Sequence, residues 1–243
     1  QPESSAASDV YKRQTLSEGG MNLIPSWFPD SDQLVFMKVN PKPKQDPARN
    51  AKIFSIDLGT GKARRLFTDK EQLKYSNAMP VVSPKGGRIA FVSNRSGEMR
   101  VWVSALDGTK AKLVSRPEQG YHKDLNLPFE QKVPAWSPDG KWIAHWEGVE
   151  MIHMSRFTGK PNPKRDQMIA NTFHVWIVGE NGGGRRRIGR GDDPTWSPDG
   201  FVTRAFPDPH RGGPVVMVGT SNGEKRLPIV PPKRHWGRFC WIP

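Results

Sequence analysis

A five-residue motif that returns along the chain constrains the fold more than any other feature of this sequence. Trp-Ser-Pro-Asp-Gly occupies residues 136–140 and 196–200, and variants of it stand at 27–31 (Trp-Phe-Pro-Asp-Ser) and 82–86 (Val-Ser-Pro-Lys-Gly). A fifth copy begins as Trp-Ile-Pro at 241–243. A unit that recurs every 45 to 60 residues indicates a repeat architecture, in which each copy is one supersecondary unit packed against its neighbours.

Each unit predicts four short strands in the same order. A proline stands two residues before each of the first four motifs (Pro25, Pro80, Pro134 and Pro194). The motif itself suits a type I turn, with serine first, proline second and glycine fourth. An apolar strand follows, such as Ile-Ala-Phe at 89–91, and then a strand rich in β-branched and aromatic residues, such as Val-Trp-Ile-Val at 175–178. A glycine turn leads to a short basic strand. The unit is an antiparallel meander, and no capped amphipathic helix is predicted between its strands.

Four-stranded units of this length, repeated around an axis, are the blades of a β-propeller. The chain is therefore predicted to be all-β, a β-propeller fragment of four-stranded antiparallel blades. Four blades are expected at about 21–68, 79–115, 133–190 and 193–229, and the start of a fifth at 238–243.

The order of the signature residues carries a family resemblance. Pro-x-Trp-Ser-Pro-Asp-Gly, then Ile-Ala, Val-Trp-Ile-Val and Arg-Arg-x-Ile, resembles the WD-like repeat of the TolB-like propellers. The same repeat recurs in the propeller domains of prolyl-oligopeptidase-type peptidases. The resemblance covers residues 21 to 243 and implies a six-bladed, periplasmic or secreted protein that works by protein–protein contact in the cell envelope.

The two ends of the sequence predict that it is an internal piece of a longer protein. Residues 4–14 resemble a translation of the adaptor used in transposase-based sequencing libraries, as metagenomic samples are prepared, so residues 1–14 are expected to be a non-native, disordered segment. Residues 15–243 are then a partial propeller that stops inside a motif. No apolar run approaches the roughly 18 residues of a membrane span. The single cysteine, Cys240, excludes a disulfide framework within these residues.

The meander places the loops on two different faces. Because strand direction alternates, the 1–2 and 3–4 turns share one face, here named the tight-turn face. The 2–3 loops (40–50, 94–97, 148–171 and 207–213) and the 4–1 connections (69–79, 116–132 and 228–238) share the other, named the long-loop face. Functional residues concentrate on loops held by a rigid scaffold. Candidate residues for a partner-binding site on this face are basic or imidazole side chains: His122, Lys123, His153, Arg165, His210, Arg211, Lys233, Arg234 and His235.

The net charge of +13 is compatible with an acidic ligand or an acidic protein partner on the long-loop face. An ordinary solvated loop surface would explain the same charges equally well. Nucleic acid is disfavoured, because most tryptophans occupy core positions of the repeat and are not free to stack on bases. Other arginines and lysines fall on each fourth strand, where basic side chains discourage edge-to-edge pairing.

Motifs for catalysis or cofactors are weak. Gly-Thr-Ser-Asn-Gly at 219–223 matches a nucleophile elbow, but it falls on a predicted 3–4 hairpin instead of a strand-to-helix turn. No metal or cofactor motif is present, and His145 and His174 are expected to pack within strands. The sequence therefore predicts a non-enzymatic scaffold that binds a protein or ligand and needs no cofactor. The alternative is the gating propeller of a serine peptidase whose catalytic domain lies outside these residues.

Overall fold

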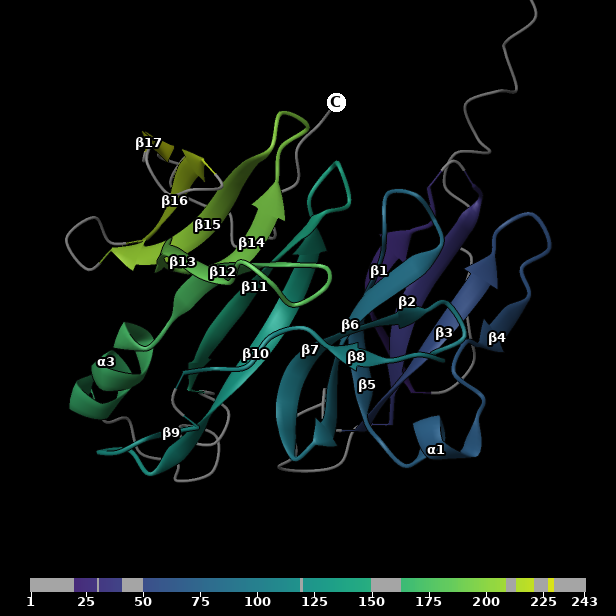
Figure 1. Ribbon diagram of the computed structural model, residues 1–243, viewed down its shortest axis with the longest axis horizontal. Helices are drawn as coiled ribbons and strands as arrows, with labels where there is room; N and C mark the ends of the chain where they lie inside the picture. Colours follow the sequence, from purple (N-terminus) through teal and green to yellow (C-terminus); the bar gives the residue numbers. More distant parts are fainter. Residues whose placement is uncertain are drawn as a thin grey trace, which may run out of the picture.

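The computed structural model describes residues 20–29, 31–40, 50–118, 120–149, 163–208, 213–220 and 227–229. Within them four antiparallel sheets follow one another, as Figure 1 shows. This arrangement confirms the predicted all-β propeller of four-stranded blades. The adaptor-like segment at 1–14 and the expected start of a fifth blade at 238–243 lie outside the described residues. No helix in the described part of the chain is both long and apolar enough to cross a membrane.

The strands of each blade run outward in chain order. The first blade contains β1 (Met21–Trp27), β2 (Gln33–Val39), β3 (Ala51–Asp57) and β4 (Ala63–Arg65). The second contains β5 (Asn77–Val82), β6 (Arg88–Ser96), β7 (Glu98–Ala105) and β8 (Lys112–Leu113).

The third blade contains β10 (Leu127–Trp136), β11 (Trp142–Val149), β12 (His174–Gly179) and β13 (Arg186–Arg190), with an extra strand, β9 (Tyr121–His122), paired to β10. The fourth contains β14 (Asp192–Trp196), β15 (Phe201–Asp208), β16 (Gly213–Thr220) and β17 (Leu227–Ile229).

The motif forms the turn that its composition predicts. The Gly140 amide donates to the Ser137 carbonyl at 2.9 Å, and Gly140 has a φ of 71°. The Ser137 hydroxyl donates to Asp139 Oδ1 at 2.6 Å, and the Lys141 amide donates to the same oxygen at 3.0 Å. These bonds to the carboxylate lower the pKa of Asp139, the serine hydroxyl contributing most. Aspartate thus locks the turn while glycine supplies the left-handed backbone that closes it.

Blades pack face to face through apolar side chains, and a motif tryptophan bridges blades two and three and another bridges blades three and four. The indole Nε1 of Trp136 donates to the Val81 carbonyl of blade two at 3.0 Å. Trp196 donates in the same way to the Ala135 carbonyl of blade three at 3.0 Å. These two side chains are 7% and 9% exposed, whereas Trp27, on the first blade, is 60% exposed. The predicted role of the motif tryptophan between blades is confirmed for Trp136 and Trp196.

A β-bulge interrupts the first long strand of every blade at the same place. The register of each strand shifts three or four residues before the end of its pairing with the next strand. The residue just before the conserved-position proline has a positive φ in all four blades: Ile24 at 53°, Met79 at 51°, Val133 at 54° and Asp193 at 43°. Isoleucine and valine rarely adopt this conformation, so each bulge stores strain of about 1–3 kcal/mol. The prolines are visible in the sequence, but the positive φ of the residue before each of them was not predicted.

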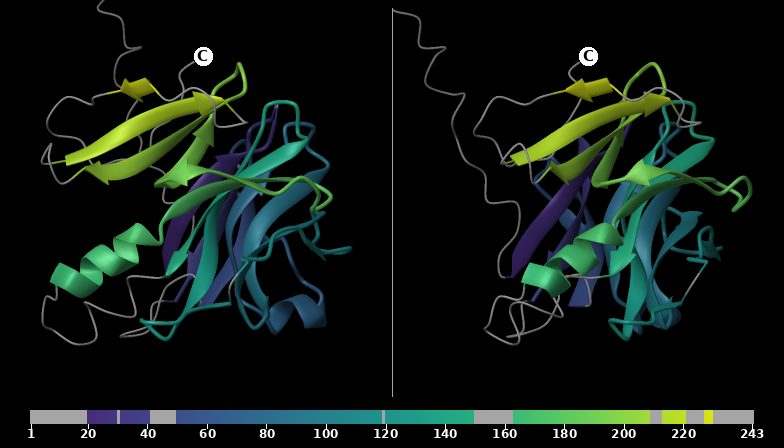
Figure 2. Two further views of the ribbon diagram at one scale, coloured as in Figure 1. Left: turned by 60° about the vertical axis from the view of Figure 1, so that its left-hand side comes forward. Right: turned by 90° about the vertical axis from the view of Figure 1, so that its left-hand side faces the viewer.

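Within the described part of the chain, the helices α1 and α3 correct the expectation that only strands and loops are present. Helix α1 (Lys70–Leu73) begins after Asp69, whose side chain accepts from the Glu71 amide at 2.8 Å. Helix α3 (Pro163–Asn171) opens with a proline, which suits the first helical position, and projects from the end of blade three (Figure 2). Because Ile169 is its one fully buried side chain among those described, the helix has no apolar periodicity that would predict it from the sequence.

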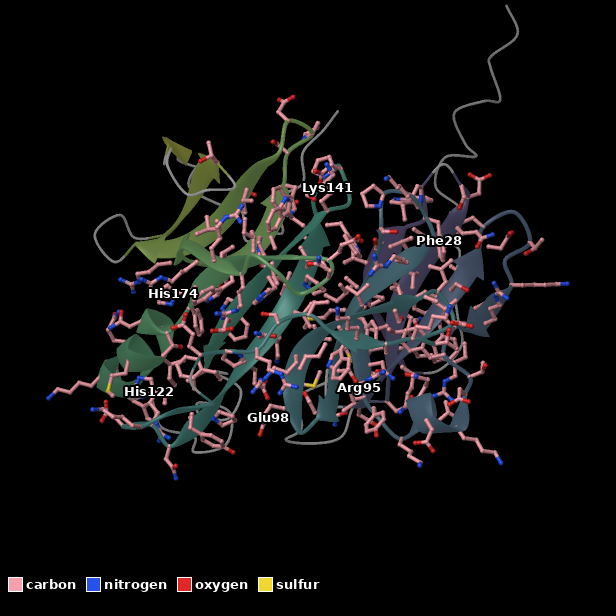
Figure 3. All side chains as sticks on the ribbon, in the orientation of Figure 1. Phe28, Arg95, Glu98, His122, Lys141 and His174 are labelled. Atoms are coloured by element: carbon pink, nitrogen blue, oxygen red, sulfur yellow. The ribbon has the colours of Figure 1, made fainter. Side chains whose placement is uncertain are left out.

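The distribution of loops over the two faces follows the meander. Figure 1 places the β10–β11 and β14–β15 turns at the upper edge and α1 and β9 at the lower edge. In Figure 3, Phe28 and Lys141 mark the tight-turn face and Glu98 and His122 the long-loop face. Several predicted loop bounds need adjustment. The strand β5 begins at Asn77, inside the expected 69–79 connection, β6 continues to Ser96, inside the expected 94–97 loop, and β10 begins at Leu127, inside the expected 116–132 connection.

Candidate functional site

The face of blade three that packs against blade two changes from apolar to polar along its length. Near the tight turns it is apolar, where Ile143 and Val178 pack with Val101 and Val103 of blade two. Toward the long-loop face the same strand positions become polar. Cross-strand pairing joins His145 to Trp176 and Glu147 to His174, and alternation puts all four side chains on one side of the sheet.

A buried polar cluster forms at this transition, consisting of Ser115, Gln131, His145, Glu147 and Arg185. Its centre is the Ser115 hydroxyl, which lies 2.8 Å from His145 Nε2. Gln131 Nε2 donates to Ser115 Oγ at 2.9 Å, and Arg185 Nε donates to it at 3.3 Å. The Gln131 side chain also accepts from the Val101 amide at 3.2 Å, which ties the cluster to the strands of both blades.

His145 is held neutral in one tautomer. Its pKa is lowered to about 3, mainly by burial and in part by the charge of Arg185, against a hydrogen bond to the Trp146 carbonyl that raises it. That carbonyl can accept only, so Nδ1, at 3.2 Å, carries the proton. Nε2 is therefore an acceptor, and the Ser115 hydroxyl donates to it.

Serine beside a neutral histidine has the local geometry of a nucleophile and its base. Here, however, Ser115 is 2% exposed and His145 is fully buried. The second nitrogen of the histidine faces a backbone carbonyl and not a carboxylate, and two further donors occupy the serine oxygen. The pair is closed to a substrate from solvent in this arrangement, and its hydrogen bonds cross-link the two blades.

Glu147 and Arg185 form the charged end of the cluster. Arg185 Nη2 donates to Glu147 Oε2 at 2.7 Å, and these side chains are 16% and 7% exposed. Gln131 Nε2 donates to the same oxygen at 2.9 Å. The guanidinium lies over the Trp176 ring at 3.5 Å from its centroid. Its Nη1 is also 3.8 Å from Glu118 Oε1, on the connection between blades two and three.

A cavity of about 300 Å³ opens next to this charged end, at the long-loop end of blade three. We call it the blade-three cavity. Its lining comes from five strands, helix α3 and the connections around them: Glu118, His122, Phe129, Glu147, Asn171, Thr172, His174, Trp176 and Arg187. Its volume is at the lower end of the range for small-molecule sites.

The two histidines of the cavity present opposite hydrogen-bonding groups. His174 Nδ1 lies 2.9 Å from the Thr172 carbonyl, so this nitrogen donates and Nε2 is left as an acceptor. Burial lowers the pKa of His174, and the charges of Arg187 and Arg190 lower it further, which favours the neutral ring. His122 Nδ1 instead accepts from the Leu125 amide at 3.3 Å, so the neutral ring carries its proton on Nε2.

The structure places three of the predicted partner-binding residues. His122, on β9, lines the cavity; Lys123 follows it in an exposed turn; and Arg165 lies partly buried on α3. Figure 3 shows His122 and His174 at the same side of the molecule. The other six candidates lie outside the described residues: His153, His210, Arg211, Lys233, Arg234 and His235.

Sequence reasoning did not assign Glu147, His174, Trp176 or Arg187 to a site. His145-x-Glu147 and His174-x-Trp176 share the two-residue period that puts side chains on one face of a strand. That signal was available, but the pairing of the two strands was not. No group of three or more histidine, cysteine or acidic side chains suited to a metal ion occurs among the described residues.

Comparison with known proteins supports the fold. No family model matches the chain. Among solved structures it is similar to TolB from Acinetobacter baumannii, with a TM-score of 0.57 and 18% identity over 86% of this chain and 44% of that one. It is similar to a putative TolB from Agrobacterium tumefaciens, with a TM-score of 0.53 and 21% identity over 79% of this chain and 61% of that one.

Peptidases share the fold as well. A puromycin-hydrolyzing peptidase from Mycobacterium tuberculosis matches with a TM-score of 0.60 and 12% identity, over 93% of this chain and 32% of that one. The chain thus spans less than two thirds of the length of each of these proteins. At such identities the likeness defines architecture alone. The chain has the fold of the TolB-like β-propellers.

Proposed function

We propose that this propeller is a binding scaffold that engages a protein or an acidic ligand through its long-loop face. One observation carries the proposal: the blade-three cavity opens on that face, among the connections that vary in length from blade to blade. Four blades joined by buried apolar clusters, with tryptophan hydrogen bonds between blades two and three and between blades three and four, form a rigid platform, which suits recognition by loops. The neighbouring TolB structures are consistent with such a role.

Charge makes an acidic partner the favoured kind. The chain carries a net charge of +13, and Lys123 is exposed beside the cavity. A basic surface attracts acidic groups and accelerates their encounter, and salt screens the effect.

The test uses poly-L-glutamate as an acidic probe and two charge-matched variants. One variant carries Lys123→Glu, Lys233→Glu and Arg234→Glu on the predicted long-loop face. The control carries Lys62→Glu, Lys85→Glu and Lys141→Glu, which stand in the turns of the tight-turn face. Binding is measured by biolayer interferometry at low salt.

The long-loop variant should bind about tenfold more weakly, because each exposed charge contributes up to about 1 kcal/mol. The control should bind as the unmodified chain does. Equal losses in both variants would reveal a simple effect of net charge, and the proposed face would then be wrong.

A second candidate, the gating propeller of a serine peptidase, is favoured by the likeness to peptidases that contain this fold. Extending the reading frame in both directions tests it. A hydrolase domain with its own Gly-x-Ser-x-Gly elbow would support this candidate over the binding scaffold. A small α/β domain before the first blade would instead support the scaffold.

A further inference from the structure

We propose that the blade-three cavity binds a neutral polyhydroxyl ligand, of the kind that a saccharide unit presents, with different hydroxyl groups bonded to His122 and His174. The inference rests on the proposed function in one respect, namely that the long-loop face is the binding face. It adds the chemical class of the ligand that would occupy this cavity.

The charges around the cavity favour a neutral ligand. Glu147 is already paired with Arg185 at 2.7 Å, and Glu118 lies 3.8 Å from the same guanidinium. Arg187 adds a second positive charge to the lining. Two carboxylates thus meet two guanidinium groups. The carboxylates would repel an anionic ligand and the guanidinium groups a cationic one, so neither kind of ligand gains a net attraction from these four charges.

The available hydrogen-bonding groups match a hydroxyl. His122 offers an N–H donor at Nε2 and His174 an acceptor at Nε2, because their Nδ1 atoms are engaged by the Leu125 amide and the Thr172 carbonyl. Neither Nε2 has a hydrogen-bond partner within the described part of the chain. A hydroxyl can accept from one ring or donate to the other, so separate hydroxyl groups of one ligand can satisfy the two rings of this cavity.

Most other polar groups named here in the lining already make hydrogen bonds within the chain. The Thr172 hydroxyl donates to the Ile169 carbonyl at 2.6 Å and accepts from the Val149 amide at 2.9 Å, so it is fully engaged. Asn171 Oδ1 accepts from Gln167 at 3.1 Å and from Arg190 at 2.7 Å. The amide nitrogen of Asn171 is therefore the group that remains to donate to a ligand oxygen.

Aromatic rings complete the wall. Phe129 and Trp176 both line the cavity, and the His122 ring is tilted by 36° to Phe129 at 6.1 Å between centroids. Small-molecule sites combine such apolar surface with a few placed polar groups. A saccharide ring, with C–H faces and a rim of hydroxyls, offers both kinds of surface at once.

The experiment titrates the full chain with a panel of small probes, by isothermal calorimetry and tryptophan fluorescence. The panel contains neutral hexoses and their disaccharides, galacturonate, glucosamine and an uncharged blocked dipeptide. The variants are His122→Ala and His174→Ala, with His174→Gln as a conservative change that keeps an acceptor. Arg186→Ala is the matched control, since Arg186 is next to Arg187 on β13 but stacks on Trp142, at 4.4 Å. Circular dichroism checks that each variant is folded.

A neutral sugar of the panel should bind, and each alanine variant should weaken it about tenfold, the value of one lost hydrogen bond. His174→Gln should lose less than His174→Ala, and Arg186→Ala should match the unmodified chain. Tighter binding of galacturonate, glucosamine or the dipeptide than of any neutral sugar would overturn the proposal. So would sugar binding that is insensitive to both alanine changes, or no sugar binding at all. If the poly-L-glutamate test succeeds while the sugars fail, the binding face stands and the ligand class is wrong.

Discussion

Removing the guanidinium of Arg185 should destabilise the chain far more than its partial exposure implies. The substitution Arg185→Met keeps most of the aliphatic stem over Trp176 but deletes the donor to Glu147 at 2.7 Å. It leaves a carboxylate that is 7% exposed, with the amide of Gln131 still donating to it. Breaking a buried ion pair from one side costs about 3–5 kcal/mol. We expect about 3 kcal/mol, because Gln131 and the adjoining cavity moderate the loss.

Urea unfolding followed by tryptophan fluorescence measures this free energy directly. For a chain of this size a loss of 3 kcal/mol corresponds to roughly 6–12 °C in Tm. Adding Glu147→Gln to Arg185→Met removes the stranded charge, so the double variant should recover most of the stability lost by the single one. The control, Arg186→Met, loses a more exposed stacking contact with Trp142 and should cost no more than about 1 kcal/mol.

The reasoning would be refuted by a double variant that is as unstable as Arg185→Met alone. That outcome would mean that the packing of the arginine stem, and not the stranded carboxylate, accounts for the cost. A loss below about 1 kcal/mol in the single variant would equally contradict the assignment of Glu147 as a buried, charge-dependent site.

Three further predictions concern stability. Trp136→Phe should cost about 1–3 kcal/mol in urea unfolding, since it deletes the bond to Val81 and leaves that carbonyl unsatisfied, whereas Trp27→Phe, at a 60% exposed position, should change little. Burial raises the pKa of Asp192 to about 6. An acid with a raised pKa stabilises the fold below its unfolded pKa, and this stability is lost as pH rises through 6. Asp192→Asn should therefore raise the unfolding free energy by up to about 3 kcal/mol at pH 7 and change it little at pH 4. Burial lowers the pKa of His145 to about 3. Its neutral form therefore contributes stability that is complete above pH 6.5 and is lost as pH falls toward 3. The unfolding free energy should accordingly fall with pH over this range, and it should fall less in His145→Gln.

The repeat predicted the fold because it acts through local chemistry. Serine, proline and glycine at 137–140 specify a turn without reference to the rest of the chain, and the alternating meander then assigns each loop to a face. The X-Pro bulges escaped prediction for the opposite reason. The residue before a proline is normally extended, but Ile24 and Val133 have a positive φ, which the local sequence does not predict.

The site was harder to predict than the fold because it depends on register between strands. His122 was identified from its loop, but Glu147 and His174 meet through the pairing of β11 with β12, which no single strand encodes. Arg185 follows a glycine turn, and in the sequence it is one of several basic residues near a fourth strand. Its role depends on Trp176 and Glu147, which face it only after the sheet has formed. Helix α3 escaped because a helix that buries a single side chain leaves no periodic pattern.

The bulge shared by the four blades divides each of these strands into two parts with separate tasks. Downstream of it the residues repeat from blade to blade and hold the tryptophan contacts. Upstream of it they differ: Asn77 and Ala78 in the second blade, Gln131 and Lys132 in the third, Asp192 in the fourth. The strained joint absorbs the extra residue, so a change upstream does not shift the register downstream. The side chains upstream of the bulge can therefore differ from blade to blade while the packing that holds the blades together stays the same.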